Sequence, residues 1–265
     1  TLHQMTEASN SYHGNPNLKP LGYQHDFSQE EIEEYVRCKE DPVYFIEKYV
    51  KIITLDRGLQ PFKLYDCQKE KVDCIMKNRR VVLMEGRQQG KTVTSAACIL
   101  HYTIFEEDKT VAIMANKSAA AREVLNRYQI MYENLPLWMQ QGVKTWNKGD
   151  VELENNSKVL TAATTAAAIR GKSVNWLYID EAAIIPNNIA DEFFTSVYPT
   201  ISAGETTKIL LTSTPLGYNH FWKFWNESVK GVNGFENMFI PYYEIPGRDE
   251  KWLEEQKQLL GQVKF

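Results

Sequence analysis

The residues best suited to chemistry form a glycine-rich stretch in the first half of the chain. It reads Gly86-Arg87-Gln88-Gln89-Gly90-Lys91-Thr92 and lies between an apolar run and a helix-like run of small residues. A loop between a strand and a helix can cradle phosphate groups with its backbone N–H groups. Lys91 would neutralise the β- and γ-phosphates, and Thr92 would bind Mg²⁺. The stretch predicts a P-loop that binds ATP with Mg²⁺.

The spacing of the glycines departs from the usual P-loop pattern. The first glycine of that pattern falls at Glu85 instead of Gly86. A Gly-Lys pair followed by Ser or Thr also occurs by chance in roughly one chain in ten of this size. Taken alone, the stretch therefore leaves a chance match open.

Two adjacent carboxylates supply the second signal. Asp180 and Glu181 directly follow the apolar run 176–179, and Asp180 lies 88 positions after Thr92 (180 − 92). A carboxylate at the end of a strand can hold Mg²⁺, and its neighbour can activate a water for in-line attack on the γ-phosphate. The alternative is an acidic strand end that faces solvent. Beside a P-loop the pair favours ATP hydrolysis, with Asp180 as a metal ligand and Glu181 as the general base.

Three hydroxyl residues, Thr212, Ser213 and Thr214, end another apolar run just before Pro215. At the carboxyl edge of a parallel sheet they could reach the γ-phosphate, the attacking water or Glu181. The local pattern alone favours a turn that begins at Pro215 and in which the hydroxyls bond to backbone groups.

Short apolar runs alternate with helical stretches from residue 80 onward. The predicted strands are 81–84, 111–115, 176–179 and 209–212. The predicted helices are 92–105, 118–135, 189–197 and 250–260, and a hairpin is expected over 151–162. The alternation predicts an α/β fold, a mostly parallel sheet with helices on both faces. Earlier in the chain, a capping box at Ser28 starts one helix, 43–50 forms another, and 1–26 is expected to be a loosely held arm.

Composition limits the class of protein. The 265 residues include 24% charged and 12% aromatic residues, as in ordinary globular domains, and no run of about 18 apolar residues that could span a membrane. The net charge of −4 argues against a simple DNA coat protein. Residues 60–100 carry eight basic and four acidic side chains, so positive charge gathers around the predicted P-loop. The four cysteines lack the spacing of a zinc site, and we expect them to be reduced.

These motifs resemble the ATPase domain of the large terminase subunit of tailed double-stranded DNA phages, closest to the T4-like group. A P-loop that contains Arg and Gln is typical of that family and accounts for the displaced glycine. The resemblance implies a P-loop NTPase fold of the additional-strand, catalytic-glutamate type, with a small C-terminal subdomain. The residues that carry it are Gly86–Thr92, Ala168-Ile169-Arg170-Gly171, Leu177–Glu181, Thr212–Pro215 and Gly217-Tyr218-Asn219-His220-Phe221.

The resemblance also implies roles for individual residues. Arg87 matches a loop arginine that senses or stabilises the γ-phosphate, and it would act with Lys91 and Glu181 in catalysis. Gln68, in Asp66-Cys67-Gln68, matches the Q-motif, whose glutamine reads the adenine edge. Thr212, Ser213 and Thr214 match the motif that couples hydrolysis to movement. Arg170 matches an Arg-Gly turn, for which DNA contact, contact between subunits and a structural role all stay open.

By the same resemblance, ATP hydrolysis would drive double-stranded DNA into a procapsid. The expected partners are a portal protein, a small terminase subunit and further copies in a ring, although the free fragment is expected to be a monomer. The expected location is the host cell cytoplasm, at the procapsid. Two alternatives stay open: a superfamily 2 helicase-like translocase, and a nucleotide-dependent docking module that is active only in the assembled ring.

We expect three regions along the chain. Residues 1–58 form an N-terminal arm and helices, 59–215 the P-loop core, and 216–265 a smaller subdomain or linker. The family's nuclease domain is expected to be absent, because the chain ends before its carboxylates could occur, so no nuclease activity is expected. An aromatic group over 221–225 fits a DNA-stacking platform, but its helical spacing favours the core. Asn78-Arg79-Arg80 fits either a DNA phosphate contact or a solvated helix end.

Overall fold

The computed structural model describes residues 11–165 and 167–261. Two helices and a small antiparallel hairpin come first: α2 (Gln29–Glu40), α3 (Pro42–Tyr49), β1 (Lys51–Thr54) and β2 (Gly58–Pro61). The elements that follow build one large sheet and its covering helices. They are α4 (Asp66–Lys77), β3 (Arg80–Glu85), α5 (Lys91–Phe105), β4 (Thr110–Ala115), α6 (Ser118–Glu133), β5 (Val143–Trp146), β6 (Asp150–Leu153), β7 (Lys158–Ala163), β8 (Trp176–Ile179), η1 (Ala182–Ile184), α7 (Asn187–Ser202), β9 (Lys208–Ser213), α8 (His220–Val229), β10 (Glu236–Ile240), η2 (Tyr242–Glu244) and α9 (Glu250–Leu260).

The large sheet has eight strands in the order β10-β3-β9-β8-β4-β7-β6-β5. Every neighbouring pair from β10 to β7 is parallel, and β7, β6 and β5 form an antiparallel extension at the other end. The predicted α/β class with a mostly parallel sheet is therefore confirmed. Strand β9 lies between β3 and β8, which brings three sequence-distant strand ends together.

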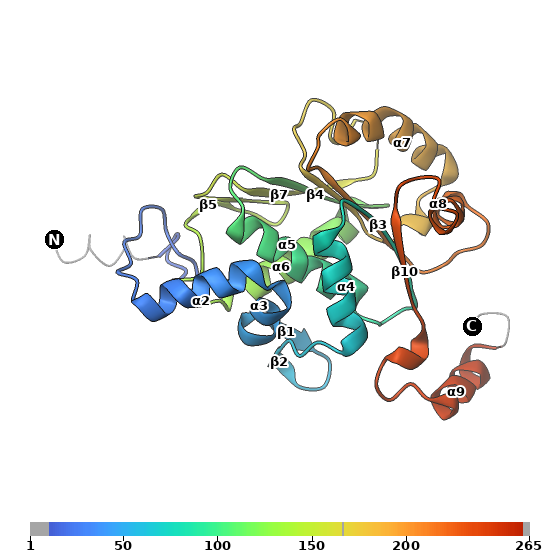
Figure 1. Cartoon of the computed structure of the whole chain (residues 1–265), viewed down its shortest axis with the longest axis horizontal. Helices are drawn as coiled ribbons and strands as arrows, with labels where there is room; N and C mark the ends of the chain where they lie inside the picture. Colours follow the sequence, from blue (N-terminus) through green and yellow to red (C-terminus); the bar gives the residue numbers. More distant parts are fainter. Residues whose placement is uncertain (1–10, 166, 262–265) are drawn as a thin grey trace.

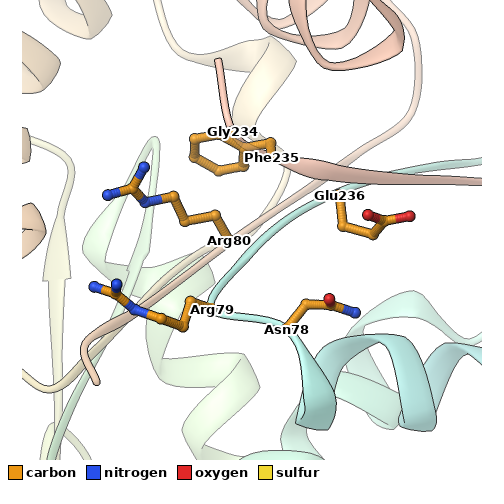
Figure 2. A pocket seen from close by; sticks show the side chains of 6 residues that line it. All are labelled: Asn78, Arg79, Arg80, Gly234, Phe235 and Glu236. Carbon is orange, nitrogen blue, oxygen red and sulfur yellow. The ribbon is translucent and has the colours of Figure 1, made fainter. Parts of the chain in front are cut away.

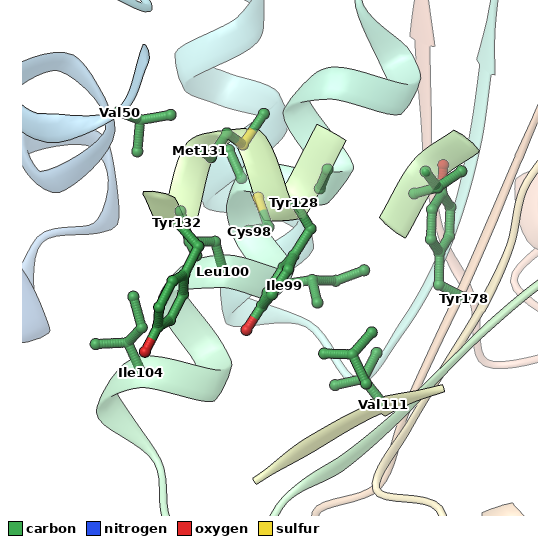
Figure 3. Packing of buried hydrophobic residues seen from close by; sticks show 14 of the residues in the cluster. Val50, Cys98, Ile99, Leu100, Ile104, Val111, Tyr128, Met131, Tyr132 and Tyr178 are labelled. Carbon is green, nitrogen blue, oxygen red and sulfur yellow. The ribbon is translucent and has the colours of Figure 1, made fainter. Parts of the chain in front are cut away.

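Helices cover both faces of this sheet (Figure 1). Alternate residues of β3 show the division, because Val81 and Leu83 belong to one buried cluster and Val82 to the other. Helices α4, α5 and α6 pack on the first face, where Tyr128, Tyr132 and the middle of α5 are fully buried (Figure 3). Helices α7 and α8 cover the second face. Strands buried on both sides account for the apolar runs in the sequence.

Most elements of the core lie where the sequence predicts them. The strand 176–179 and the helix 250–260 have the predicted bounds, and the capping box between Ser28 and Glu31 is present. Strands β1, β2, β5 and β10 were not predicted. Strand β10 pairs with β3, so part of the segment expected to form a smaller subdomain extends the main sheet. The division of the chain into three regions stays a prediction.

The start of the described chain corrects one expectation. Leu18 is buried in the core, and the backbone N–H of Lys19 donates to the side-chain oxygen of Gln140 (3.0 Å). The expectation of a loosely held arm is therefore wrong for these residues. Residues 1–10 of the expected arm lie outside the residues that the structure describes. In the described parts of the chain, no helix combines the length and apolarity needed to cross a bilayer. All four cysteines are free thiols, and three of them are buried.

Candidate active site

Three parallel strands end side by side and carry the predicted chemistry. Strand β3 leads into the loop 86–90, β8 leads into Asp180 and Glu181, and β9 between them ends in the hydroxyl residues. The carboxyl ends of parallel strands point to the same edge of a sheet, where α/β proteins place their ligands. The sheet order therefore brings the three sequence signals to one edge.

The loop between β3 and α5 is tightly turned. Gln88 and Gly90 both have positive φ angles, 56° and 82°. The positive φ of Gly90 favours glycine there, and a Cβ would lie 2.7 Å from Nε2 of Gln68, so the Gln68 side chain would also have to move. The backbone N–H of Gly86 donates to the side-chain oxygen of the buried Gln89 (2.7 Å). This hydrogen bond joins the first residue of the loop to the side chain of its fourth.

Lys91 and Glu181 form an ion pair across the site. Their Nζ and Oε1 atoms lie 2.6 Å apart, and the side chains are 7% and 31% exposed. Glu181 has left-handed backbone angles (φ 51°, ψ 48°), which are unfavourable for a residue with a Cβ. A residue keeps such a conformation only where the surrounding structure defines it strongly. The carboxylate is therefore held beside the P-loop lysine while part of it stays open to water.

Asp180 is more deeply buried than Glu181 and is held by hydroxyl groups. Its Oδ1 accepts hydrogen bonds from Tyr178 (2.9 Å) and Thr212 (3.0 Å), and Oγ1 of Thr92 lies 3.3 Å from Oδ2. Burial raises the pKa of Asp180, and the charge of Glu181 adds to this, while the bonds from Tyr178 and Thr212 act in the opposite direction. A cation at this carboxylate would relieve the cost of burying its charge.

Each of the three hydroxyl residues at the end of β9 contacts the 180–183 segment. Thr212 donates to Asp180, and Thr214 donates to Oε2 of Glu181 (3.4 Å). Ser213 accepts a hydrogen bond from the backbone N–H of Ala183 (3.0 Å). Thr214 makes the contact with Glu181 that the sequence left as one possibility. Ser213 bonds to a backbone group, which is the other possibility, that of a simple turn.

Gln68 and Arg87 lie beside the loop in different settings. Gln68 is buried, and its side-chain oxygen accepts the backbone N–H of Tyr65 (3.0 Å), while its amide nitrogen lies against Gly90. Arg87 is exposed. Its backbone oxygen and that of Gln88 accept hydrogen bonds from Arg248 (3.4 and 2.7 Å). Contacts of Gln68 with adenine and of Arg87 with phosphate stay predictions.

The residues present fit a magnesium nucleotide. Among the described residues, no group of three His, Cys, Asp or Glu side chains could hold a metal on its own. Mg²⁺ in nucleotide sites is bound by one or two protein oxygens together with phosphates and waters. The hydroxyl of Thr92 beside the carboxylate of Asp180 is such a pair, and the side chain of Lys91 at the start of α5 is a cation of the kind that phosphates require.

Two sets of contacts around the loop are not predicted by the sequence motifs. Lys71 of α4 and Glu85 at the end of β3 form a fully buried ion pair, with 2.9 Å between Nζ and Oε2. Glu85 directly follows the apolar run 81–84, and a charged residue at that position was the sequence feature that could have indicated a buried ion pair. Arg248, which ties the C-terminal segment to the loop, lies about 160 positions away along the chain and gave no local signal.

Some singled-out residues lie away from this edge. Arg170 is exposed in the turn before β8 and lines a cavity of about 320 Å³. Asn78 and Arg79 precede β3, and Arg80 is its first residue, at the opposite edge of the sheet. All three line a cavity of about 400 Å³ with Glu236. Figure 2 shows both guanidinium groups pointing to one side, away from Glu236. Arg79 donates to the backbone oxygen of Thr207 (3.1 Å), so it is bound to the protein rather than merely solvated.

The aromatic group of α8 belongs mainly to the core. Phe221 is fully buried, and Phe224 and Trp225 pack against the same cluster. Trp222 is 43% exposed and lies edge-on to Tyr218. The core interpretation is confirmed for three of the four residues.

Residues 82–259 match the family described as "Terminase large subunit, T4likevirus-type, N-terminal". The chain belongs to this family. The matched part contains the P-loop, both carboxylates and the hydroxyl triplet, so the resemblance stated from the motifs is confirmed.

Solved terminase structures share the fold. The large terminase of bacteriophage HK97 has a TM-score of 0.64 and 18% identity, over 86% of this chain and 49% of that one. The large terminase ATPase domain of Thermus phage P74-26 has a TM-score of 0.61 and 19% identity, over 76% and 90%. The large terminase of a further thermophilic bacteriophage, in complex with ADP, has a TM-score of 0.58 and 11% identity, over 76% and 51%. The chain thus spans about half of the HK97 terminase and of the ADP-bound terminase, and most of the P74-26 domain.

Proposed function

We propose that the chain is the ATPase motor domain of a phage large terminase subunit, which hydrolyses ATP to move double-stranded DNA into a procapsid. One observation carries the proposal. Lys91 and Thr92 of the P-loop meet Asp180 and Glu181 at one edge of the sheet, with Lys91 and Glu181 2.6 Å apart. A phosphate-binding cation, a hydroxyl–carboxylate pair for Mg²⁺ and a second carboxylate beside them are the parts that ATP hydrolysis requires.

Nucleotide binding exchanges the partner of Lys91. The backbone N–H groups of residues 86–92 and the start of α5 bind the phosphates, and Lys91 leaves Glu181 for them. The side-chain amide of Gln68 lies beside Gly90, and we assign it to the contact with the adenine ring. Freed from Lys91, the carboxylate of Glu181 becomes available as a base.

Hydrolysis then uses the two carboxylates differently. Glu181 takes a proton from the attacking water. Asp180 and Thr92 would hold Mg²⁺, which would neutralise charge on the phosphates. Arg87 is assigned to the charge that develops on the transferred phosphoryl group. The contacts of Thr212, Ser213 and Thr214 with residues 180–183 support their assignment as the coupling motif.

The biological setting follows from the family. A ring of copies on a portal protein, regulated by a small terminase subunit, would act on double-stranded DNA at the procapsid in the host cytoplasm. Complexes of a thermophilic bacteriophage's large terminase with ADP and with ATP-gamma-S support a nucleotide as the ligand. Within the chain, residues 59–215 are assigned to the ATPase core and the flanking regions to its support and to movement.

Steady-state ATP hydrolysis tests the function, measured for the chain and for Glu181→Gln with and without double-stranded DNA. The proposal predicts turnover that disappears in Glu181→Gln, while a nonhydrolysable ATP analogue still binds both proteins. Turnover in Glu181→Gln at the wild-type rate would contradict the role of Glu181. Binding without turnover in either protein would contradict an independent ATPase and favour a docking module that acts only in the ring.

A further inference from the structure

The turn that follows Glu181 is held from outside by two side chains of the C-terminal segment. The side-chain amide of Asn219 donates to the backbone oxygen of Ala183 (2.8 Å). Nε2 of His220 donates to the backbone oxygen of Ala182 (2.7 Å). These carbonyls belong to the two residues directly after Glu181. Neither contact is used in the proposed chemistry, although both residues lie in a motif that the sequence singled out.

The turn needs such support because of its backbone. Glu181 adopts left-handed angles (φ 51°), and η1 (Ala182–Ile184) begins at the next residue. A non-glycine residue keeps this conformation only where its surroundings define it strongly. Ser213 contributes a third contact by accepting the N–H of Ala183 (3.0 Å). Both polar groups of the Ala182–Ala183 peptide and the carbonyl of Ala183 are therefore bonded to side chains from the end of β9 and the start of α8.

The supporting residues are themselves fixed. Oδ1 of Asn219 accepts the backbone N–H groups of Phe221 and Trp222 (3.1 and 3.2 Å) and so caps α8. The backbone N–H of His220 donates to the side chain of Asn187 at the start of α7 (3.1 Å). Phe221 then anchors α8 in the core. The Glu181 turn is thus attached to the packed ends of two helices and not to a free loop.

We propose that Asn219 and His220 are positioning residues for Glu181. They hold the carbonyl groups of Ala182 and Ala183, which keeps the left-handed turn and directs the Glu181 carboxylate across the site toward Lys91. This inference rests on the proposed role of Glu181 as the general base. A base must be placed within hydrogen-bond reach of the water that it activates, so loosening the turn lowers the rate of hydrolysis more than nucleotide affinity.

The variant Asn219→Asp separates the support of the Glu181 turn from the capping of α8. The carboxylate keeps an oxygen for the N–H groups of Phe221 and Trp222, but it cannot donate to Ala183. The matched control is Asn233→Asp. Asn233 also donates to a backbone oxygen, that of Phe224 (2.9 Å), and accepts a backbone N–H, that of Phe235 (3.1 Å), but it holds no site residue.

The expected result is a fall in kcat of about 10-fold or more for Asn219→Asp. Its KM for ATP and its Tm should change no more than those of Asn233→Asp. His220→Gln, which keeps a donor, should retain more of kcat than His220→Leu. Equal kcat values for Asn219→Asp and Asn233→Asp, or equal losses in the two His220 variants, would overturn the inference.

Two further measurements keep the result interpretable. Glu181→Gln in the same assay tests the proposed function separately, because full activity in that variant would remove the base and not only its support. The methyl resonance of Ala182, the residue directly after Glu181, reports the conformation of the turn without turnover. It should shift or broaden in Asn219→Asp and keep its position in Asn233→Asp, and an unchanged resonance in both would also overturn the inference.

Discussion

Two lysine–glutamate pairs flank the same loop but lie in different surroundings. Lys71 and Glu85 are 2.9 Å apart, and neither side chain is exposed. Lys91 and Glu181 are 2.6 Å apart, and Glu181 is 31% exposed. The charged groups are the same in both pairs, so the difference between them lies in access to water and ligand.

This difference separates a fixed contact from an exchangeable one. The buried pair joins α4, which carries Gln68, to the end of β3, where the loop begins. Because both groups are buried, each charge is stable only while the other is present. The attraction is offset by the cost of removing both groups from water, so the pair fixes α4 against β3 more than it adds net stability. The Lys91–Glu181 pair is partly open to water, and under the proposed function phosphate groups would replace the carboxylate as the partner of Lys91.

The largest expected effect comes from breaking the buried pair. Lys71→Met leaves the Glu85 carboxylate without its partner and should lower the free energy of unfolding by about 3–5 kcal/mol. Lys71→Met combined with Glu85→Leu should recover most of this loss, because no unpaired charge remains. Urea unfolding of the three proteins measures both effects. A double variant as unstable as the single one would contradict the account.

The stability of Lys71→Met should also depend on pH. Burial raises the pKa of Glu85, and the charge of Lys71 opposes this rise. Without Lys71 the folded protein holds a proton that the unfolded chain releases above about pH 4.5. Stability therefore falls as the pH rises, and the loss in Lys71→Met should be larger at pH 8 than at pH 5. An equal loss at the two pH values would contradict the assignment.

The second effect concerns the exchangeable pair. Lys91→Ala should weaken binding of a nonhydrolysable ATP analogue by about 100-fold, or ~3 kcal/mol, because the phosphates lose a charged partner. Its Tm should fall far less than that of Lys71→Met, since Glu181 can be solvated. Titration calorimetry and thermal unfolding give the two values. A loss of stability as large as that of Lys71→Met would remove the distinction between the pairs.

A smaller effect is expected at Tyr178, whose hydroxyl contacts Asp180, the residue proposed to hold Mg²⁺. Tyr178→Phe removes the hydroxyl that donates to Asp180 (2.9 Å) and should weaken Mg²⁺ binding by about 10-fold. The Mg²⁺ concentration for half-maximal hydrolysis measures it. Tyr128→Phe is the control, because Tyr128 is equally buried and bonds to Thr103 (2.8 Å) on the helical side of the core. The same shift in both variants would point to a general packing effect.

The smallest effect is expected at a surface pair. Lys48 and Glu34 are 2.7 Å apart with side chains 48% and 19% exposed, so Lys48→Met should cost less than about 1 kcal/mol. Partial burial acts to raise the pKa of Glu34, but hydrogen bonds from Lys48, Tyr49 and Tyr44 outweigh it and lower the value to about 2. The stability from Glu34 is present above its ordinary pKa and is lost as the pH falls from about 4.5 toward 2. Carbon NMR should show the Glu34 pKa rising in Lys48→Met, and an unchanged value would assign the shift to the tyrosines.

Much of the fold was predictable because the parallel strands are buried on both faces. Runs such as 176–179 are apolar throughout, and polar residues mark where they end. Strand β10 was missed because its partner β3 lies about 150 positions away and its residues are only partly buried. The hairpin β1–β2 is short and mostly exposed, so it has no apolar pattern to reveal it.

The site was predictable where its chemistry is local in the sequence. The loop 86–92, Asp180 and Glu181 each stand at the end of a strand, and parallel strands bring such ends together. The support of Glu181 was not predictable, because Asn219 and His220 act on backbone carbonyls more than 30 positions away. Only the packing of α8 against η1 reveals that contact.

The central claim is that Glu181, which pairs with Lys91 in this structure and is released from it when ATP binds, activates the water that attacks the γ-phosphate. Single-turnover cleavage of ATP with the protein in excess tests it most directly, because even slow chemistry is seen before product release. The account predicts cleavage by the wild-type chain and a rate at least about 100-fold lower for Glu181→Gln, with equal amounts of ATP bound. Cleavage at the same rate by both proteins would contradict it.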